Sequence, residues 1–181
     1  MKSIMFVVTG RIRDAAAPRP NSEQGGAITD TIAKERDPEG FMTWPELKAM
    51  AASGLVEIGS HTRSHRHWVK TEPYADLHVE LEGSRRDIES KLGAWSGAFA
   101  WPWGDFKEGW LPLTSEIGYR TCFTTMIGVN TPGTDPFLIC RLDVGKPGLG
   151  WFRMYRHPAT PMLIRFYGLK RAYRGLIGGK A

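Results

Sequence analysis

Short apolar runs recur along the chain, and polar stretches with apolar residues at helical spacing separate them. Runs of this length, bounded by turn residues, are typical of buried strands. They predict strands at residues 3–9, 55–58, 98–101, 119–125 and 137–144. The alternation of strands with helical patterns predicts an α/β fold, built on a mainly parallel sheet or barrel without internal repeats.

The first helix is predicted by its capping residues. Thr43 and Glu46 have the T-x-x-E spacing of a capping box, and Pro45 lies in the first turn. Gly54 follows as a stop residue, because glycine readily adopts the left-handed conformation that ends helices. The next predicted strand begins directly after it.

Two further helices are predicted by spacing. Residues 73–92 carry leucine and isoleucine at helical spacing and stop at Gly93, and residues 107–117 stop at Gly118. Residues 11–40 are instead rich in Pro, Gly, Asp and Arg. This composition predicts a surface excursion with at most a short helix.

The stretch E-I-G-S-H-T-R-S-H at residues 57–65 carries the first candidate chemistry. An apolar strand ends there at a Gly-Ser turn, and α/β folds build their sites at the carboxyl ends of strands. Neutral imidazoles of His61 and His65 are suitable ligands for one divalent cation. The alternative interpretation is a pair of solvent-exposed loop histidines.

A second segment, F-A-W-P-W-G at residues 99–104, has the pattern of a strand that turns outward at its end. With H-T-x-x-H, V-V-T-G-R-I at residues 7–12 and T-W-P-E-L at residues 43–47, it makes the chain resemble the polysaccharide deacetylase family, also called carbohydrate esterase family 4. The resemblance covers residues 3–145 and rests mainly on the first two motifs.

The resemblance implies a metal-dependent hydrolase that removes acetyl groups from N-acetylated polysaccharides or oligosaccharides, on an irregular (β/α) barrel. It implies a divalent metal, zinc foremost, held by His61 and His65. The backbone N–H of Trp103 would donate to the oxyanion of the reaction. Pro102, Trp101 and Trp103 would contact the substrate.

The chain also departs from the family pattern. Family members carry a Thr-Phe-Asp-Asp motif, with one Asp as general base and the other as metal ligand, on the strand before the one that matches residues 1–7. No Asp-Asp pair occurs in this sequence, and Ala100 stands where the family has an arginine. We therefore expect an N-terminally truncated barrel that lacks its first strand. A deacetylase-type hydrolase, a catalytically silent carbohydrate-binding relative or fragment, and a basic surface-binding protein all remain open.

Basic charge is concentrated near the C-terminus. Residues 151–181 contain seven Lys or Arg and no Asp or Glu, in a chain whose net charge is +5. This predicts a deacetylase-like domain at residues 1–150 and a basic, helical segment at residues 151–181. Contact of that helix with an anionic membrane surface or a polyanion, and packing on the barrel, are the alternatives. No nucleic-acid partner is expected.

Length and composition fit one domain, since 181 residues with 41% hydrophobic residues suffice for one core. No apolar stretch has the length of a membrane span, and no signal-peptide pattern precedes the first strand. Because truncation is expected, the localisation is left open. The exposed edge of the strand at residues 3–9 predicts self-association.

The positions of five other residues lead to further predictions. Cys122 and Cys140 lie in apolar runs and are expected to be buried thiols. His67 is expected to contact solvent or its own loop. Arg141, with Asp143, matches a family segment with a recurring arginine, and an ion pair between the two is the alternative.

Overall fold

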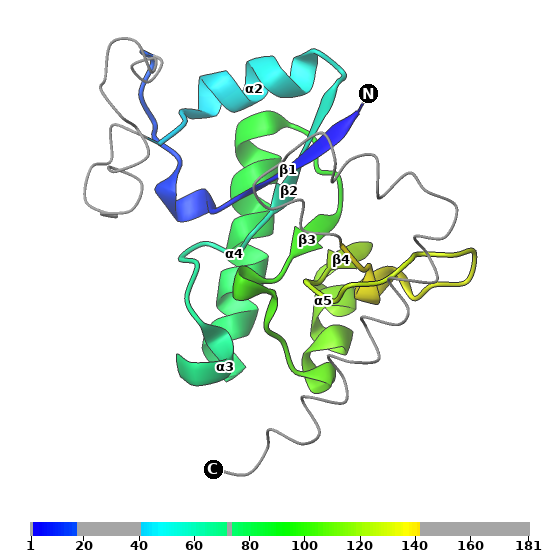
Figure 1. Cartoon of the computed structure of the whole chain (residues 1–181). Helices are drawn as coiled ribbons and strands as arrows, with labels where there is room; N and C mark the ends of the chain where they lie inside the picture. The colour runs from blue at the N-terminus through cyan, green and yellow to red at the C-terminus, as the bar shows by residue number, and fades with distance from the viewer. Residues whose placement is uncertain (1, 18–40, 72–73, 142–181) are drawn as a thin grey trace, which may run out of the picture.

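The computed structural model describes residues 2–17, 41–71 and 74–141, and four parallel strands form its sheet. Each strand pairs with the next one along the chain, in the order β1-β2-β3-β4 (Figure 1). The strands are β1 (Ser3–Val7), β2 (Val56–Ser60), β3 (Ala98–Ala100) and β4 (Thr121–Phe123). The expected α/β class with a parallel sheet is therefore confirmed.

Helices connect the strands, as parallel pairing requires. The α-helices are α2 (Trp44–Ala52), α3 (Trp68–Thr71), α4 (Tyr74–Leu92) and α5 (Leu111–Ile117). Short 3-10 helices are η1 (Thr9–Arg11), η3 (Pro102–Gly104), η4 (Glu108–Trp110) and η5 (Pro136–Leu138). No helix among the described residues is long and apolar enough to cross a membrane.

The start of α2 confirms the predicted capping box. The Thr43 amide donates to the Glu46 carboxylate at 2.7 Å, and the Glu46 amide donates to the Thr43 hydroxyl at 3.4 Å. Gly54 has a φ of 69°, so it adopts the left-handed conformation expected after the helix. Trp44 and Leu47 from this helix are buried.

Helix α4 contributes to both hydrophobic clusters of the core. Its Leu77 and Leu81 pack in a cluster with aromatic residues of β3 and the α5 region, and its Ile88 packs with residues of β1, β2 and α2. Both clusters exclude water from one face of α4 and thereby fix this helix against the sheet.

The sheet is strongly curved. Gly59 on β2 pairs with Phe6 on β1, and a Cβ at Gly59 would lie 2.8 Å from the Phe6 ring. The Phe6 ring extends to Phe123 on β4, at a centroid distance of 5.1 Å. Side chains of the two outer strands therefore meet inside the curve, as in a barrel interior. The described strands do not close the barrel, because β1 and β4 are not paired.

The strand predicted at residues 137–144 is wrong over residues 137–141, the part that the structure describes. Residues 136–138 form η5, and Ile139 makes only an isolated bridge to Phe123. Asp135 and Pro136 favour this turn, since the Asp135 carboxylate accepts from the Phe137 amide at 2.8 Å. The short helix α3 was not predicted.

Several predictions lie outside the described residues. These are the basic helical segment at residues 151–181, the boundary near residue 150, Asp143 and most of the excursion at residues 11–40.

Candidate functional site

The H-T-x-x-H loop begins at the carboxyl end of β2, as predicted. The His61 amide donates to the Val7 carbonyl at 2.9 Å, which continues the pairing of β2 with β1. The rings of His61 and His65 have centroids 4.9 Å apart. The structure therefore brings together the two imidazoles expected to bind metal.

His61 has the protonation state of a metal ligand. Its Nδ1 lies 2.7 Å from the carbonyl oxygen of Ala100, which accepts only, so Nδ1 carries the proton. The Nε2 lone pair is then available to a cation. Burial is the main cause that lowers the pKa of His61 to about 4, with smaller electrostatic contributions from His65 and Arg141, despite the bond to Ala100. The ring is neutral at pH 7.

A strained turn places His65 beside His61. Thr62 and His65 have φ angles of 65° and 59°, a region that non-glycine residues rarely adopt. The buried Thr62 hydroxyl accepts from the His65 amide at 3.1 Å, while the Thr62 amide donates to the Ser60 hydroxyl at 3.3 Å. These two bonds stabilise the turn, so Thr62 orients the loop that carries His65.

Trp103 forms an aromatic wall next to the histidines. Its side chain is 61% exposed, and its ring centroid lies 5.3 Å from that of His65. The His67 ring also stacks with the Trp103 ring, with centroids 6.0 Å apart at an interplanar angle of 19°, and His67 Nε2 lies 3.1 Å from the Asp105 carboxylate. His67 thus joins its loop to the loop after β3.

The structure places the other aromatic candidate in the core. Trp101 has 0% exposure and makes an edge-to-face contact with Phe99 at 4.8 Å. Its indole is therefore not available to stack on a sugar, and Pro102 is buried as well. Trp101 precedes the turn and points into the core, whereas Trp103, with a φ of 61°, projects from the turn.

His61, His65 and Trp103 form a rim at the carboxyl ends of the strands. Arg141 lies close to this rim. Its Nε donates to the Thr124 carbonyl at 2.7 Å, and its guanidinium carbon lies 6.0 Å from the centroid of the Phe6 ring. Partial burial lowers the pKa of Arg141. In the sequence, Arg141 was a candidate only because it matches a family segment with a recurring arginine. Its position above the Phe6 ring depends on the curvature of the sheet.

The donor set fits a cation only in part. His61 and His65 supply two nitrogen ligands, but no group of three His, Cys, Asp or Glu suited to a metal occurs among the described residues. Two imidazoles without a carboxylate bind zinc weakly compared with the usual three protein ligands.

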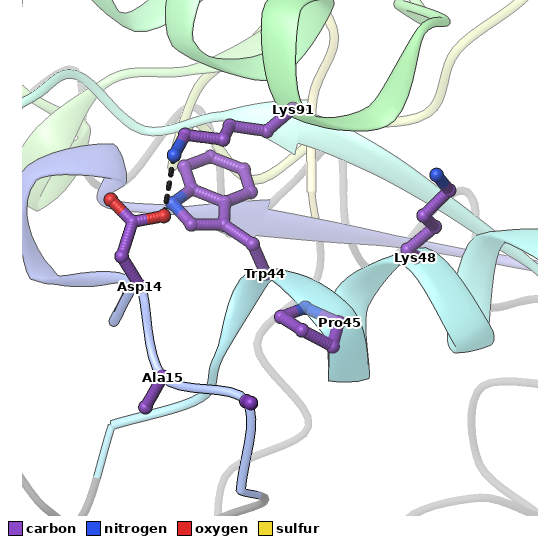
Figure 2. A pocket seen from close by; sticks show the side chains of 7 residues that line it. Asp14, Ala15, Trp44, Pro45, Lys48 and Lys91 are labelled. Atoms are coloured by element: carbon purple, nitrogen blue, oxygen red, sulfur yellow. Dashed lines mark hydrogen bonds and ion pairs between the residues drawn. The ribbon is translucent and has the colours of Figure 1, made fainter.

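A separate hollow lies beside α2 (Figure 2). Residues Asp14, Ala15, Ala16, Trp44, Pro45, Lys48 and Lys91 line it. Asp14 and Lys91, both in its lining, form an ion pair. None of these lining residues belongs to the histidine site, and the lining contains no Ser, Thr, Cys or His.

Known proteins share this fold. The sequence model of the polysaccharide deacetylase family matches residues 1–122. A de-N-acetylase from Aggregatibacter actinomycetemcomitans is 19% identical with a TM-score of 0.62, over 84% of this chain and 64% of that one. The BpsB deacetylase domain from Bordetella bronchiseptica is 22% identical with a TM-score of 0.60, over 77% and 60%.

A polysaccharide deacetylase from Bacillus cereus is 20% identical with a TM-score of 0.62, over 84% of this chain and 40% of that one. The chain thus spans between 40% and 64% of the length of these three structures. No curated protein matches the sequence. At these identities the similarity to the solved structures establishes the fold.

Proposed function

This chain belongs to the polysaccharide deacetylase family, and from that premise we propose that its histidine rim serves the hydrolysis of acetyl amides on an N-acetylated polysaccharide. Zinc is the divalent cation that we propose for the site, held by His61 and His65. The substrate would lie along the exposed face of Trp103.

The observation that carries the proposal is the state of His61. Its Nδ1 is committed to the Ala100 carbonyl, and its lowered pKa keeps the ring neutral, so Nε2 is prepared to bind a cation next to the His65 ring. A bound divalent cation of this kind supplies polarisation of the acetyl carbonyl and acidification of a water molecule.

Trp103 has two roles in the proposal. Its backbone N–H would donate to the developing oxyanion, in a turn whose conformation is fixed by the bond from the Gly104 amide to the Trp101 carbonyl at 3.0 Å. Its exposed indole would bind the apolar face of a sugar ring. Pro102 stiffens this turn, because proline fixes its own φ.

The general base is not among these residues. No Asp-Asp pair occurs in the sequence, and no described carboxylate completes a three-ligand set with the histidines. In the described sheet β1 is an outer strand, so a strand that carried two aspartates and paired with β1 would reach the same rim. We propose that activity depends on such a strand.

The test is an acetate-release assay on N-acetylglucosamine oligomers with Zn²⁺ present. The 181-residue chain is compared with a version extended upstream by a Thr-Phe-Asp-Asp strand. We expect the 181-residue chain to be slower by about 10²–10⁴-fold, the usual contribution of general-base catalysis. Comparable rates that His61→Ala abolishes would show that another residue of this chain supplies the base.

The second candidate is a carbohydrate-binding protein without activity. The exposed Trp103 ring next to a site without a carboxylate favours it. Binding of the oligomers by both versions, with no acetate released by either, would support this alternative.

A further inference from the structure

We propose that Glu80 of α4 is a positioning residue that holds the H-T-x-x-H loop in its metal-binding conformation, an inference that rests on the proposed function. The Oε2 atom of Glu80 accepts three hydrogen bonds from the loop. The donors are the Arg63 amide at 3.0 Å, the Ser64 amide at 2.8 Å and the Ser64 hydroxyl at 2.9 Å.

These bonds lie between the two histidines. His61 is fixed by β1 and by Ala100, and the path of the three residues that separate the histidines determines where the backbone of His65 lies. Thr62 and His65 both have positive φ angles, a strained conformation that persists only where the surroundings stabilise it. A carboxylate that accepts from two consecutive amides supplies charge-assisted bonds of the stronger kind.

The other polar groups of the loop have different partners. The carbonyls of Thr62 and Arg63 accept from the Thr9 and Gly10 amides at 3.1 and 3.0 Å, so η1 binds one side of the loop. The amides of Arg63 and Ser64 are the groups bonded to Glu80. The loop is thus held between η1 and α4, and Glu80 supplies the bonds to its backbone from the helix.

A second carboxylate of α4 also contacts the loop, but in another way. Asp87 accepts from the Arg63 side chain at 2.9 Å and from the Thr9 hydroxyl at 2.7 Å. The Arg63 side chain is 50% exposed, and exposed ion pairs contribute little to stability. The Asp87 contacts do not bond the backbone of residues 62–65, so they constrain the placement of His65 less directly than Glu80 does.

The neighbouring Glu82 provides a matched control. Its carboxylate lies 2.6 Å from Arg86 and 4.0 Å from His78, both on α4. Glu82→Ala removes the same side chain from the same helix without touching the loop. Glu80→Gln is the conservative variant, since its amide oxygen accepts hydrogen bonds but carries no charge.

The experiment measures Zn²⁺ affinity by titration calorimetry for wild type, Glu80→Ala, Glu80→Gln and Glu82→Ala. Replacing a residue that orients metal ligands typically weakens binding by about 10–100-fold, and we expect a loss of this size for Glu80→Ala. We expect a smaller loss for Glu80→Gln and wild-type affinity for Glu82→Ala. Titration with Co²⁺ is expected to give an altered visible spectrum in Glu80→Ala, because the geometry of the ligands changes.

A metal-free readout separates this inference from the proposed function. The ring protons of His65 sense the ring current of Trp103, whose centroid is 5.3 Å away, so their NMR shifts report the placement of His65. We expect the shifts to move in Glu80→Ala and to remain in Glu82→Ala. If the wild type bound no metal while the shifts moved as expected, the proposed metal function would fail and the positioning role would stand.

Two results would overturn the inference. One is wild-type Zn²⁺ affinity in both Glu80 variants, and the other is an unchanged His65 shift in both. If Glu80→Ala does not fold, as judged by circular dichroism, Glu80→Gln decides the same two points.

Discussion

Phe6 and Phe123 lie on the two outer strands of the described sheet, β1 and β4, yet their ring centroids are only 5.1 Å apart. Their contact spans the concave face, and Gly59 on β2 leaves the room for the Phe6 ring. The same curvature brings the carboxyl ends of the strands together. His61, Trp103 and Arg141 therefore lie at one rim, although they come from distant parts of the chain.

Gly59→Ala is expected to destabilise the protein by about 1–3 kcal/mol, the usual cost of overpacking a core. The new Cβ would lie 2.8 Å from two atoms of the Phe6 ring and 3.1 Å from the Ala98 carbonyl oxygen. Urea unfolding measures the change in free energy. Gly109→Ala is the control, because a Cβ there meets nothing within 4 Å, and we expect its effect to stay within about 0.5 kcal/mol. Equal effects of the two variants would contradict the described packing of the curved sheet.

Zn²⁺ is expected to raise the thermal unfolding temperature of the wild type, since a ligand that binds only the folded state stabilises it by mass action. His61→Ala and His65→Ala are expected to lose this shift. His78→Ala is expected to keep it, because His78 is half-exposed on α4 and contacts Glu82. Differential scanning fluorimetry measures the shift. Equal stabilisation of wild type and the His61/His65 double variant would refute the metal assignment.

The buried thiol of Cys122 is expected to make stability fall at alkaline pH. Burial raises the pKa of Cys122 from 9.0 to about 11 in the folded state. Between these values the unfolded chain has lost the proton while the folded protein keeps it, so the unfolding free energy decreases as the pH rises. A shift of this size corresponds to roughly 2–3 kcal/mol.

Urea unfolding at pH 8, 9, 10 and 11 tests this dependence. Cys122→Ala is expected to lower stability at pH 8 but to show a shallower decrease above pH 9. The buried Tyr119, whose pKa is raised to about 12, contributes to the remaining slope in both proteins. Identical slopes in wild type and variant would remove Cys122 as the cause.

Local signals in the sequence predicted the elements well. The Thr43 capping box and the glycines after the helices determine where helices begin and end, and those bounds are confirmed within a few residues. Local sequence is sufficient to predict these helix ends, because each capping or stop residue acts on backbone within one helical turn. The error at residues 137–141 arose because an apolar run does not distinguish a strand from a 3-10 turn started by Asp135.

Contacts between distant segments were not predictable in the same way. The H-T-x-x-H motif made His61 and His65 the candidate metal ligands, but the acceptor for His61 Nδ1 is a backbone carbonyl on β3, and Glu80 comes from α4. No residue pattern encodes such partners. Trp101 and Trp103 look equivalent in the motif, and only the turn between them sends one ring into the core and the other to the surface.

Ile4→Lys is expected to reduce self-association, if the outer edge of β1 pairs with another copy of the chain. Ile4 is 37% exposed on a strand with one free side in the described sheet, and lysine on an edge strand opposes such pairing. Sedimentation velocity across a range of concentrations is the measurement. Val79→Lys, at a side chain 63% exposed on α4, is the control. A wild type that stays monomeric at all concentrations would end the proposal.

Trp103→Ala is expected to weaken binding of N-acetylglucosamine oligomers by about tenfold or more, since aromatic faces contribute roughly 1–3 kcal/mol to stacking contacts. The side chain is 61% exposed and outside both core clusters, so we expect little change in the unfolding temperature. Titration calorimetry with the oligomers measures the affinity.

Leu55→Ala is the matched control for Trp103→Ala, because Leu55 is 56% exposed and lies just before β2, at the opposite end of the strands. It removes an exposed apolar side chain that is not part of the rim. We expect this variant to bind the oligomers like the wild type. A loss of affinity in Leu55→Ala equal to that in Trp103→Ala would mean that general surface hydrophobicity, rather than the indole beside His65, determines the binding. Retention of affinity by Trp103→Ala would place the carbohydrate contact elsewhere on the molecule.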